Sequence, residues 1–127
     1  MTSLSDFKST FMTIEDRAPV IVAHLTKPSL TEEENIEQLG QDFAILVEHY
    51  GCRKLVVDLG VVTLATSSAL GKLISLHRNL HRREGHLVVC GVKGMVLDVM
   101  LTAKLTDYFS IAESVDEAVA RLNETPG

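Results

Sequence analysis

Three consecutive hydroxyl side chains, Thr66, Ser67 and Ser68, are the residues of this sequence best placed to do chemistry. They follow an apolar run at 54–60 and open an amphipathic helix predicted at about 67–83, so they lie at a strand-to-helix junction. At a helix start, unpaired backbone N–H groups and the helix dipole stabilise an oxyanion or a capping oxygen. One hydroxyl is enough to cap a helix, and phosphorylation of another would add about −1.5 to −2 charges. On the residues alone, capping and a phosphorylation switch both stay open.

No known catalytic motif surrounds these hydroxyls. A phosphate-binding loop ending in Gly71-Lys72 would need glycine and Ser/Thr where the sequence has Thr66 and Leu73. Ser68 and Lys72 are four residues apart, whereas a serine–lysine nucleophile pair needs a spacing of three. Neither serine stands in a Gly-x-Ser-x-Gly elbow. We therefore predict that the chain is not an enzyme, for want of a paired acid, base or nucleophile.

Histidines and one strand-end carboxylate are weaker candidates. His77 and His81 have an acceptable spacing for two zinc ligands, but a third ligand would have to come from elsewhere and no acidic residue lies between them. We expect His77 at the edge of the core, His81 on the surface, and no metal. Asp58 ends a strand, where open α/β sheets place ligands, yet a structural role is predicted because no second acid or nucleophile accompanies it. Exposed or hydrogen-bonded imidazoles are expected at His24 and His49.

Around the junction, strands alternate with helices. The predicted strands span about 7–15, 20–25, 54–59, 87–91 and 109–112, with a turn at 16–19. The predicted helices follow a capping box at Thr31–Glu34, span about 67–83 and 94–104, and follow a second box that begins at Ser114. The first two strands pair as an antiparallel hairpin, and the later strand–helix–strand units require parallel strands with right-handed crossovers. The expected fold class is α/β: a mixed sheet of about five strands with about four helices packed against it, in one domain over 1–127 with a core of about 7–122.

Composition excludes several classes of protein. A net charge of −5 without a basic block argues against non-specific nucleic-acid binding. No apolar run approaches the roughly 20 residues of a membrane span, and a signal-peptide pattern is lacking, so we expect a cytoplasmic protein outside the membrane. Cys52 and Cys90 suit reduced core thiols better than a disulfide. The basic cluster at 78–83 closes the central helix, where cations complement the dipole, and no cofactor is predicted.

From Val20 to Leu122 the chain resembles the STAS domain, the fold of bacterial anti-sigma factor antagonists. In that family, a strand of the type apolar-apolar-Asp-Leu leads to a segment like Phe-Met-Asp-Ser-Ser-Gly-Leu-Gly. Here Val57-Asp58-Leu59 is followed at 64–71 by Leu-Ala-Thr-Ser-Ser-Ala-Leu-Gly. The chain departs from the family pattern at Thr66, where the family has Asp, and at Ala69, where it has Gly.

The resemblance implies a non-catalytic regulator of sigma-factor-dependent transcription. Its partner would be an anti-sigma factor that is itself a serine kinase of the histidine-kinase-like ATPase type. The family's phosphoacceptor is the serine after its Asp, which falls on Ser67, with Ser68 and Thr66 as alternative acceptors. The partner would contact Thr66, Ser67, Ser68, Lys72 and Ser75, and a phosphate at Ser67 would weaken that contact.

Two other functions stay open. Thr66 lacks the negative charge that the family places beside the acceptor, which favours a constitutive, unphosphorylated STAS scaffold in a larger signalling or transport complex, with a homo-oligomer as one form. Alternatively, the same helix start could bind a small anionic ligand or a nucleotide.

Overall fold

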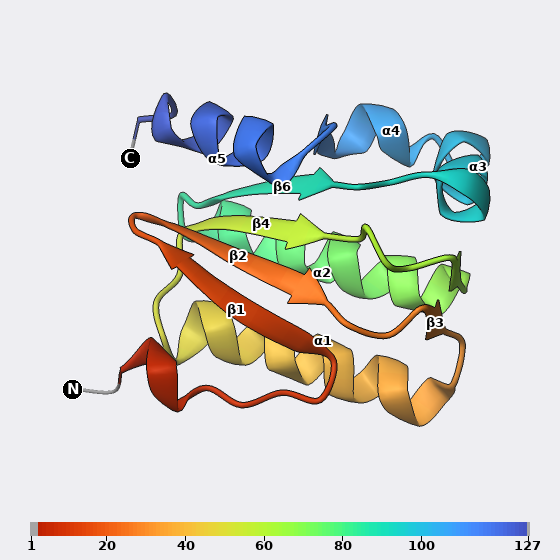
Figure 1. The fold of residues 1–127 in the computed structure, drawn as a ribbon, viewed down its shortest axis with the longest axis horizontal. Helices are drawn as coiled ribbons and strands as arrows, with labels where there is room; N and C mark the ends of the chain where they lie inside the picture. Colours follow the sequence, from red (N-terminus) through yellow and green to blue (C-terminus); the bar gives the residue numbers. More distant parts are fainter. Residues whose placement is uncertain (1–2, 127) are drawn as a thin grey trace.

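A five-stranded mixed sheet forms the centre of the protein in the computed structural model, which describes residues 3–126 (Figure 1). The strands are hydrogen-bonded in the order β1 (Met12–Arg17), β2 (Val20–Leu25), β4 (Lys54–Asp58), β6 (His86–Cys90) and β7 (Ser110–Ala112). β1 pairs antiparallel with β2, and every later pair is parallel. The predicted α/β fold class with a mixed sheet is confirmed.

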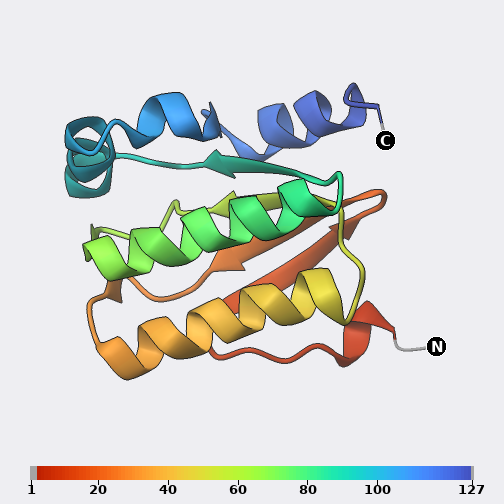
Figure 2. The same ribbon diagram turned by 180° about the vertical axis from the view of Figure 1, so that it is seen from behind.

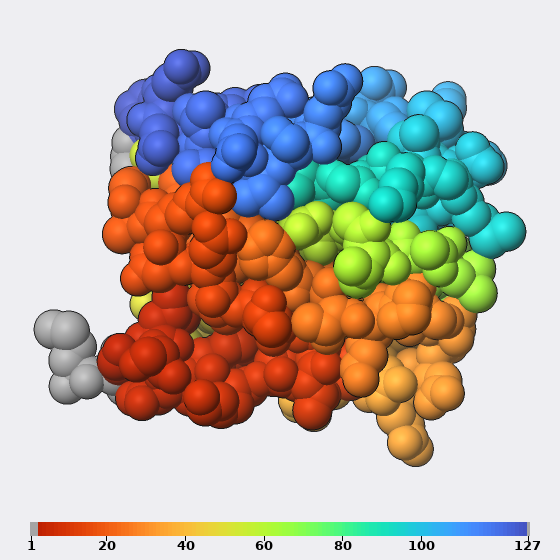
Figure 3. Space-filling model, in the orientation of Figure 1, coloured from red at the N-terminus to blue at the C-terminus, as the bar shows by residue number. Residues whose placement is uncertain are grey.

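Helices cover both faces of this sheet. On one face, α1 (Glu33–Glu48) and α2 (Ser67–Arg82) lie side by side, as Figure 2 shows. On the other face, α5 (Val115–Asn123) packs against β2, β4 and β6. In the space-filling view, α5 (blue) and the β1–β2 hairpin (red and orange) lie next to each other on this face (Figure 3). α3 (Gly94–Thr102) and α4 (Leu105–Tyr108) connect β6 to β7.

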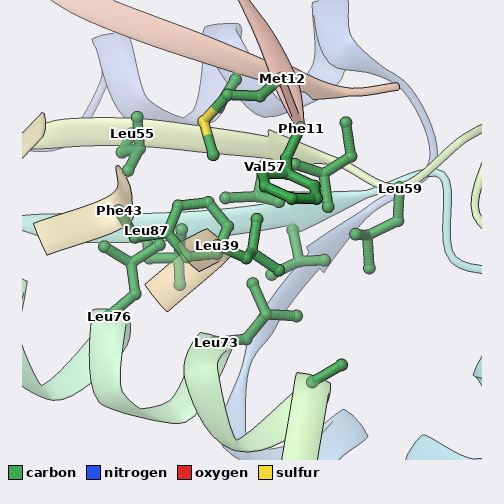
Figure 4. Close-up of a cluster of buried hydrophobic side chains, with 14 of the residues drawn as sticks. Phe11, Met12, Leu39, Phe43, Leu55, Val57, Leu59, Leu73, Leu76 and Leu87 are labelled. Atoms are coloured by element: carbon green, nitrogen blue, oxygen red, sulfur yellow. The ribbon is translucent and has the colours of Figure 1, made fainter. Parts of the chain in front are cut away.

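Alternate residues of the central strands enter two separate cores. Leu55 and Val57 of β4 pack with Phe43 of α1 in the larger core, which also receives α2 (Figure 4). Val56 points to the opposite face and joins the smaller cluster beneath α5. A strand that is buried on both faces needs a continuous apolar run, which accounts for the Leu-Val-Val sequence at 55–57.

The N-terminal segment differs from the prediction. The sequence predicts a first strand at 7–15 and a turn at 16–19, whereas β1 spans Met12–Arg17 and the turn is limited to residues 18–19. Ser9 Oγ donates a hydrogen bond of 2.6 Å to Asp42 Oδ2 of α1, and Asp42 is buried. This bond connects the segment before β1 to α1, while the carbonyl oxygens of Thr10 and Phe11 accept hydrogen bonds from Thr26, directly after β2.

The capping box predicted at Thr31–Glu34 is wrong. α1 begins at Glu33 after Glu32, whose side chain makes no capping hydrogen bond. The hydroxyl oxygen of Thr31 lies instead 3.4 Å from that of Ser29. Glu33 and Glu34 in the first turn favour the helix start through the dipole.

Two features of the structure were not predicted from the sequence pattern. The helix predicted at 94–104 ends at Thr102, because Lys104 has a left-handed backbone (φ 60°), and α4 follows as a fifth helix. A second sheet of two short parallel strands, β3 (Ser29–Leu30) and β5 (Leu64–Ala65), joins segments far apart in the sequence. By contrast, the final helix begins as predicted, with Ser114 Oγ accepting a hydrogen bond from the Glu117 N–H at 3.1 Å.

Candidate functional site

The segment between β4 and α2 crosses the carboxyl end of the sheet. Its exit from β4 is fixed by a 2.8 Å hydrogen bond from the Gly60 N–H to Asp58 Oδ1. β5 then pairs with β3, and the Thr66 N–H donates to the Leu30 carbonyl oxygen at 3.2 Å. These backbone contacts hold the start of α2 at the edge where open α/β sheets place their ligands.

Thr66 caps α2, while Ser67 and Ser68 lie outside the cap. Thr66 has an extended backbone, and its Oγ1 accepts a hydrogen bond of 3.3 Å from the Ala69 N–H. Ser67 and Ser68 are the first two helical residues, and both are exposed. The first turn reads Ser-Ser-Ala-Leu and so contains no carboxylate. The helix start therefore presents two hydroxyl groups to solvent at the positive end of the dipole.

Lys72 and Ser75 lie farther along α2 and face α1. Lys72 Nζ pairs with Glu37 Oε1 at 3.1 Å, and the Lys72 side chain is 27% exposed. Its methylene chain covers Gly40, where a Cβ atom would lie 2.8 Å from Lys72 Cδ. Ser75 is exposed and lines, with Lys72, a hollow of about 240 Å³ between the two helices. The structure thus brings residues 66–68 together and places Lys72 and Ser75 on a neighbouring surface, so their roles stay predictions.

Three large apolar side chains are exposed near the start of α2, and we call them the apolar patch. Val61 and Leu64 precede α2 and are 51% and 42% exposed, while Met95 in the first turn of α3 is 57% exposed. α3 packs beside β5, and its Val96 lines the same small cavity as Ala69 of α2. Figures 1 and 2 both show α3 and the start of α2 at the same end of the sheet. Where exposed apolar side chains adjoin on a surface, they are typical of interaction sites.

Asp58 belongs to a hydrogen-bonded network across three strands. The β2–β4 register sets His24 beside Asp58, with His24 Nδ1 2.7 Å from Asp58 Oδ2. His24 Nε2 lies 2.8 Å from Glu15 Oε1, and Arg17 Nε donates to Glu15 Oε2 at 2.6 Å. Burial opposes protonation of His24, but the bonds with Glu15 and Asp58 outweigh it and raise the pKa of the imidazole above its ordinary value. This network joins the sheet to the turn that leads toward α2.

Part of this network could have been found from the sequence. His24 and Asp58 stand near the ends of predicted neighbouring parallel strands, whose carboxyl ends meet at one edge. The sequence could not have predicted that Glu15 joins this network. The predicted turn at 16–19 would pair Glu15 with Val20, too far along the strand to reach His24. The shorter turn pairs Glu15 with Val22 instead, two positions nearer to His24.

The histidine pair and the cysteines are placed as predicted. His77 is half-buried and His81 is exposed. Cys52 and Cys90 are free and buried, and burial raises the pKa of their thiols to about 11 and about 12. No group of three or more His, Cys, Asp or Glu side chains within residues 3–126 is arranged to hold a metal ion.

The sequence matches the family model of the STAS domain over residues 8–118. This chain belongs to the STAS domain family of anti-sigma factor antagonists. One relative is the putative anti-sigma factor antagonist BtrV of Bordetella bronchiseptica. BtrV is 31% identical over 86 residues, covering 68% of this chain and 73% of BtrV. In the part of this STAS protein that the structure describes, no helix is both long enough and apolar enough to cross a membrane.

Solved structures of STAS proteins share this fold. An anti-sigma factor antagonist domain protein of Planctomyces limnophilus has a TM-score of 0.77 at 18% identity, covering 89% of this chain and 98% of that one. SpoIIAA in its unphosphorylated form has a TM-score of 0.69 at 13% identity, covering 90% and 99%. The phosphorylated form of SpoIIAA from Bacillus has a TM-score of 0.67 at 16% identity, covering 87% and 98%. The resemblance to the STAS domain is confirmed, and at these identities the structural likeness concerns the fold alone.

Proposed function

We propose that this STAS protein is an anti-sigma factor antagonist: a non-catalytic regulator that binds an anti-sigma factor kinase at the start of α2 and thereby controls sigma-factor-dependent transcription. The observation that carries the proposal is the exposure of Ser67, whose hydroxyl is not used by the helix cap. A kinase can reach this hydroxyl without unfolding the helix. The assignment of the relative BtrV supports the same role.

Phosphorylation of Ser67 would act as the release signal. A phosphate at the first residue of α2 is compatible with the fold, because the dipole and the nearby backbone N–H groups favour an anion there. A partner that covers Val61, Leu64 and Met95 would have to bury the same phosphate beside apolar surface. Removing a dianion from water in such an interface is costly, so the modified protein would bind its partner more weakly.

Thr66, which stands where the family pattern has aspartate, caps α2 in this protein. Both residues cap helices well, so the exchange keeps the cap and removes one negative charge beside the acceptor. Of the alternative acceptors, Ser68 is exposed, whereas the Thr66 oxygen is half-buried and accepts the Ala69 N–H. Ser67 is therefore the first acceptor to test and Ser68 the second.

Phosphopeptide mass spectrometry tests the proposal. Wild type, Ser67→Ala and Ser68→Ala are incubated with ATP and a purified anti-sigma factor kinase of the same organism. We expect phosphate on Ser67 in wild type and Ser68→Ala, and none in Ser67→Ala.

The two alternative functions, an unphosphorylated scaffold and a small-anion site, predict different results for the same protein samples. Absence of phosphate from all three hydroxyls, with elution as a stable large assembly, would favour an unphosphorylated scaffold or homo-oligomer. A rise in the thermal midpoint with inorganic phosphate or ATP alone would favour a small-anion site, because a ligand specific to the folded state raises apparent stability.

A further inference from the structure

A second polar surface, the basic trough, lies near the opposite end of α2. Two adjoining hollows of about 440 Å³ and about 230 Å³ form it, between the second half of α2, α4 and the end of α5. Its principal side chains are His77, Arg78, His81, Arg82, Tyr108 and Arg121. Arg78 lies about three turns along the helix from Ser67, so the trough is distinct from the surface proposed above.

The charged side chains that line the trough are the three arginines, Arg78, Arg82 and Arg121, although the chain has a net charge of −5. Among the described residues, no Asp or Glu lines either hollow. Arg78 and Arg82 are exposed and take part in none of the ion pairs formed within residues 3–126. Arg121, by contrast, is paired with Glu117 at 3.0 Å. In the described part of the chain, the two arginines of α2 are therefore not held in an ion pair and are available to a partner.

The helix dipole explains only part of this cluster. His81 and Arg82 lie in the last turn of α2, where cations complement the dipole, as the sequence predicts. Arg78 lies one turn earlier, beyond the range of that effect, and Tyr108 comes from another helix. The helix dipole therefore does not explain why Arg78 and Tyr108 lie on the same surface as His81 and Arg82.

Aromatic rings form the floor of the trough. The ring centroids of His77 and Tyr108 are 4.8 Å apart, and His77 meets the buried Phe109 edge-on at 6.1 Å. The His81 ring stacks over His77 at 6.2 Å with an interplanar angle of 9°. Burial, with a smaller contribution from His81, lowers the pKa of His77 and favours its neutral ring. The floor is thus a surface of tilted aromatic rings that rests on the buried Phe109, and the arginines supply the charge.

We propose that the basic trough binds an extended, acidic segment of a partner protein. An Arg guanidinium pairs with a carboxylate through two parallel hydrogen bonds. Arg78 and Arg82 are one helical turn apart, with Cβ atoms about 5–6 Å apart. Side chains two residues apart on an extended chain are separated by about 6.7 Å. Acidic residues at alternate positions can therefore pair with both arginines while the segment crosses the floor of His77 and Tyr108.

The distribution of charge favours a chain over a small anion. Arg78 and Arg82 line one hollow, and Arg121, which is paired with Glu117, lines the other, so the guanidinium groups are spread along the trough. A single phosphate or carboxylate needs donors that converge on one point. The acidic character of the whole molecule also disfavours nucleic acid, whose affinity depends on broad phosphate neutralisation.

Fluorescence anisotropy tests the proposal with a labelled ten-residue peptide of alternating glutamate and alanine at low ionic strength. The variants are Arg78→Gln/Arg82→Gln in the trough and Lys27→Gln/Lys93→Gln as the control. Lys27 and Lys93 are exposed and absent from the lining of the trough, and the control changes the net charge equally. We expect the trough variant to bind the peptide about tenfold more weakly and the control variant less than twofold more weakly.

Several results would overturn the proposal, once circular dichroism has verified that both variants fold. Failure of wild type to bind the peptide, or equal losses in the two variants, would show that the trough does not recognise acidic segments. Tighter binding of a labelled ten-nucleotide thymidine oligonucleotide, lost in the same trough variant, would assign the surface to nucleic acid instead.

Discussion

Two adjacent hydroxyl residues at the start of α2 have different tasks. Thr66 caps the helix through the Ala69 N–H, and Ser67 faces solvent. We predict that Thr66→Ala lowers the free energy of unfolding by about 1 kcal/mol. Ser67→Ala should change it by less than about 0.5 kcal/mol, since surface substitutions away from such features have small effects. Urea denaturation of both variants measures the free energy of unfolding. Equal decreases in the two variants would contradict the assignment of the cap to Thr66 alone.

A permanent charge at Ser67 should mimic its phosphorylated state. We predict that Ser67→Asp weakens binding of the anti-sigma factor kinase at least tenfold, about 1.4 kcal/mol, because the carboxylate would be buried against the partner. Ser67→Asn has nearly the same shape without the charge and should bind as wild type does. Isothermal titration calorimetry compares the two, and similar affinities would show that charge at this position does not control docking.

The His24 network should make stability depend on pH. The pKa of His24 is raised in the folded state, so the stabilisation from its proton is complete below the unfolded value of about 6.5. It is lost as the pH rises through the higher folded value. We predict that the stability difference between wild type and His24→Gln narrows as the pH rises from about 6.5 into the alkaline range. His49→Gln, at an exposed position that ends α1, is the control in urea denaturation across this range, and a constant difference for His24→Gln would contradict the prediction.

At the scale of elements, the ends of β4 and β6 approach each other closely through Gly91. Gly91 has a left-handed backbone (φ +73°), and a Cβ atom there would lie 2.7 Å from the Gly60 nitrogen and 2.9 Å from Asp58 Oδ1. We predict that Gly91→Ala destabilises the protein by about 1–3 kcal/mol, because it adds backbone strain and displaces this turn.

Gly71 provides the matched control for Gly91. It lies inside α2, and a Cβ atom there would meet nothing within 4 Å. Gly71→Ala should therefore stabilise the protein by about 0.5–1 kcal/mol, because alanine favours a helix over glycine. Thermal unfolding of both variants checks the pair, and destabilisation by Gly71→Ala would show that the helix start has less room than its geometry indicates.

Sequence periodicity predicted the elements that depend on a continuous local pattern. α2 and β4 end within about one residue of their predicted limits, because their apolar stripes or runs are unbroken. The α3–α4 break depends on a left-handed Lys104 with no glycine to mark it, and β3 and β5 are two-residue strands that form only when the chain folds. The periodicity of apolar residues therefore could not predict the α3–α4 break or the β3–β5 pairing.

The same distinction applies to the candidate site. Residues 66–68 are neighbours in the sequence, so their hydroxyl chemistry could be predicted before the fold was known. The apolar patch draws Val61, Leu64 and Met95 from two segments, and an apolar residue outside a regular pattern gives no sign that it is exposed. Its existence depends on the way α3 packs beside β5.

For the molecule as a whole, α2 connects two surfaces of different chemistry. Its first residues and the apolar patch form one surface, and its later turns form the basic trough. α2 is held against the sheet by residues such as Leu73 and Leu80, which are buried in the larger core. A rigid helix between the two surfaces keeps their separation fixed, so one partner could contact both only if its own binding groups have the same spacing.

The apolar patch allows the partner surface to be separated from the fold. Met95 is 57% exposed in the first turn of α3, and Leu101 is 54% exposed six residues later, on a different side of the helix. We predict that Met95→Gln weakens kinase binding about tenfold, as loss of a buried interface anchor would, while Leu101→Gln leaves the affinity unchanged. Both variants should stay within about 0.5 kcal/mol of wild-type stability, because neither side chain fills the core. Calorimetric titration with the anti-sigma factor kinase, together with urea denaturation, measures both quantities. Equal affinities for the two variants would remove the patch from the docking surface and leave the Thr66–Ser68 junction to account for recognition alone.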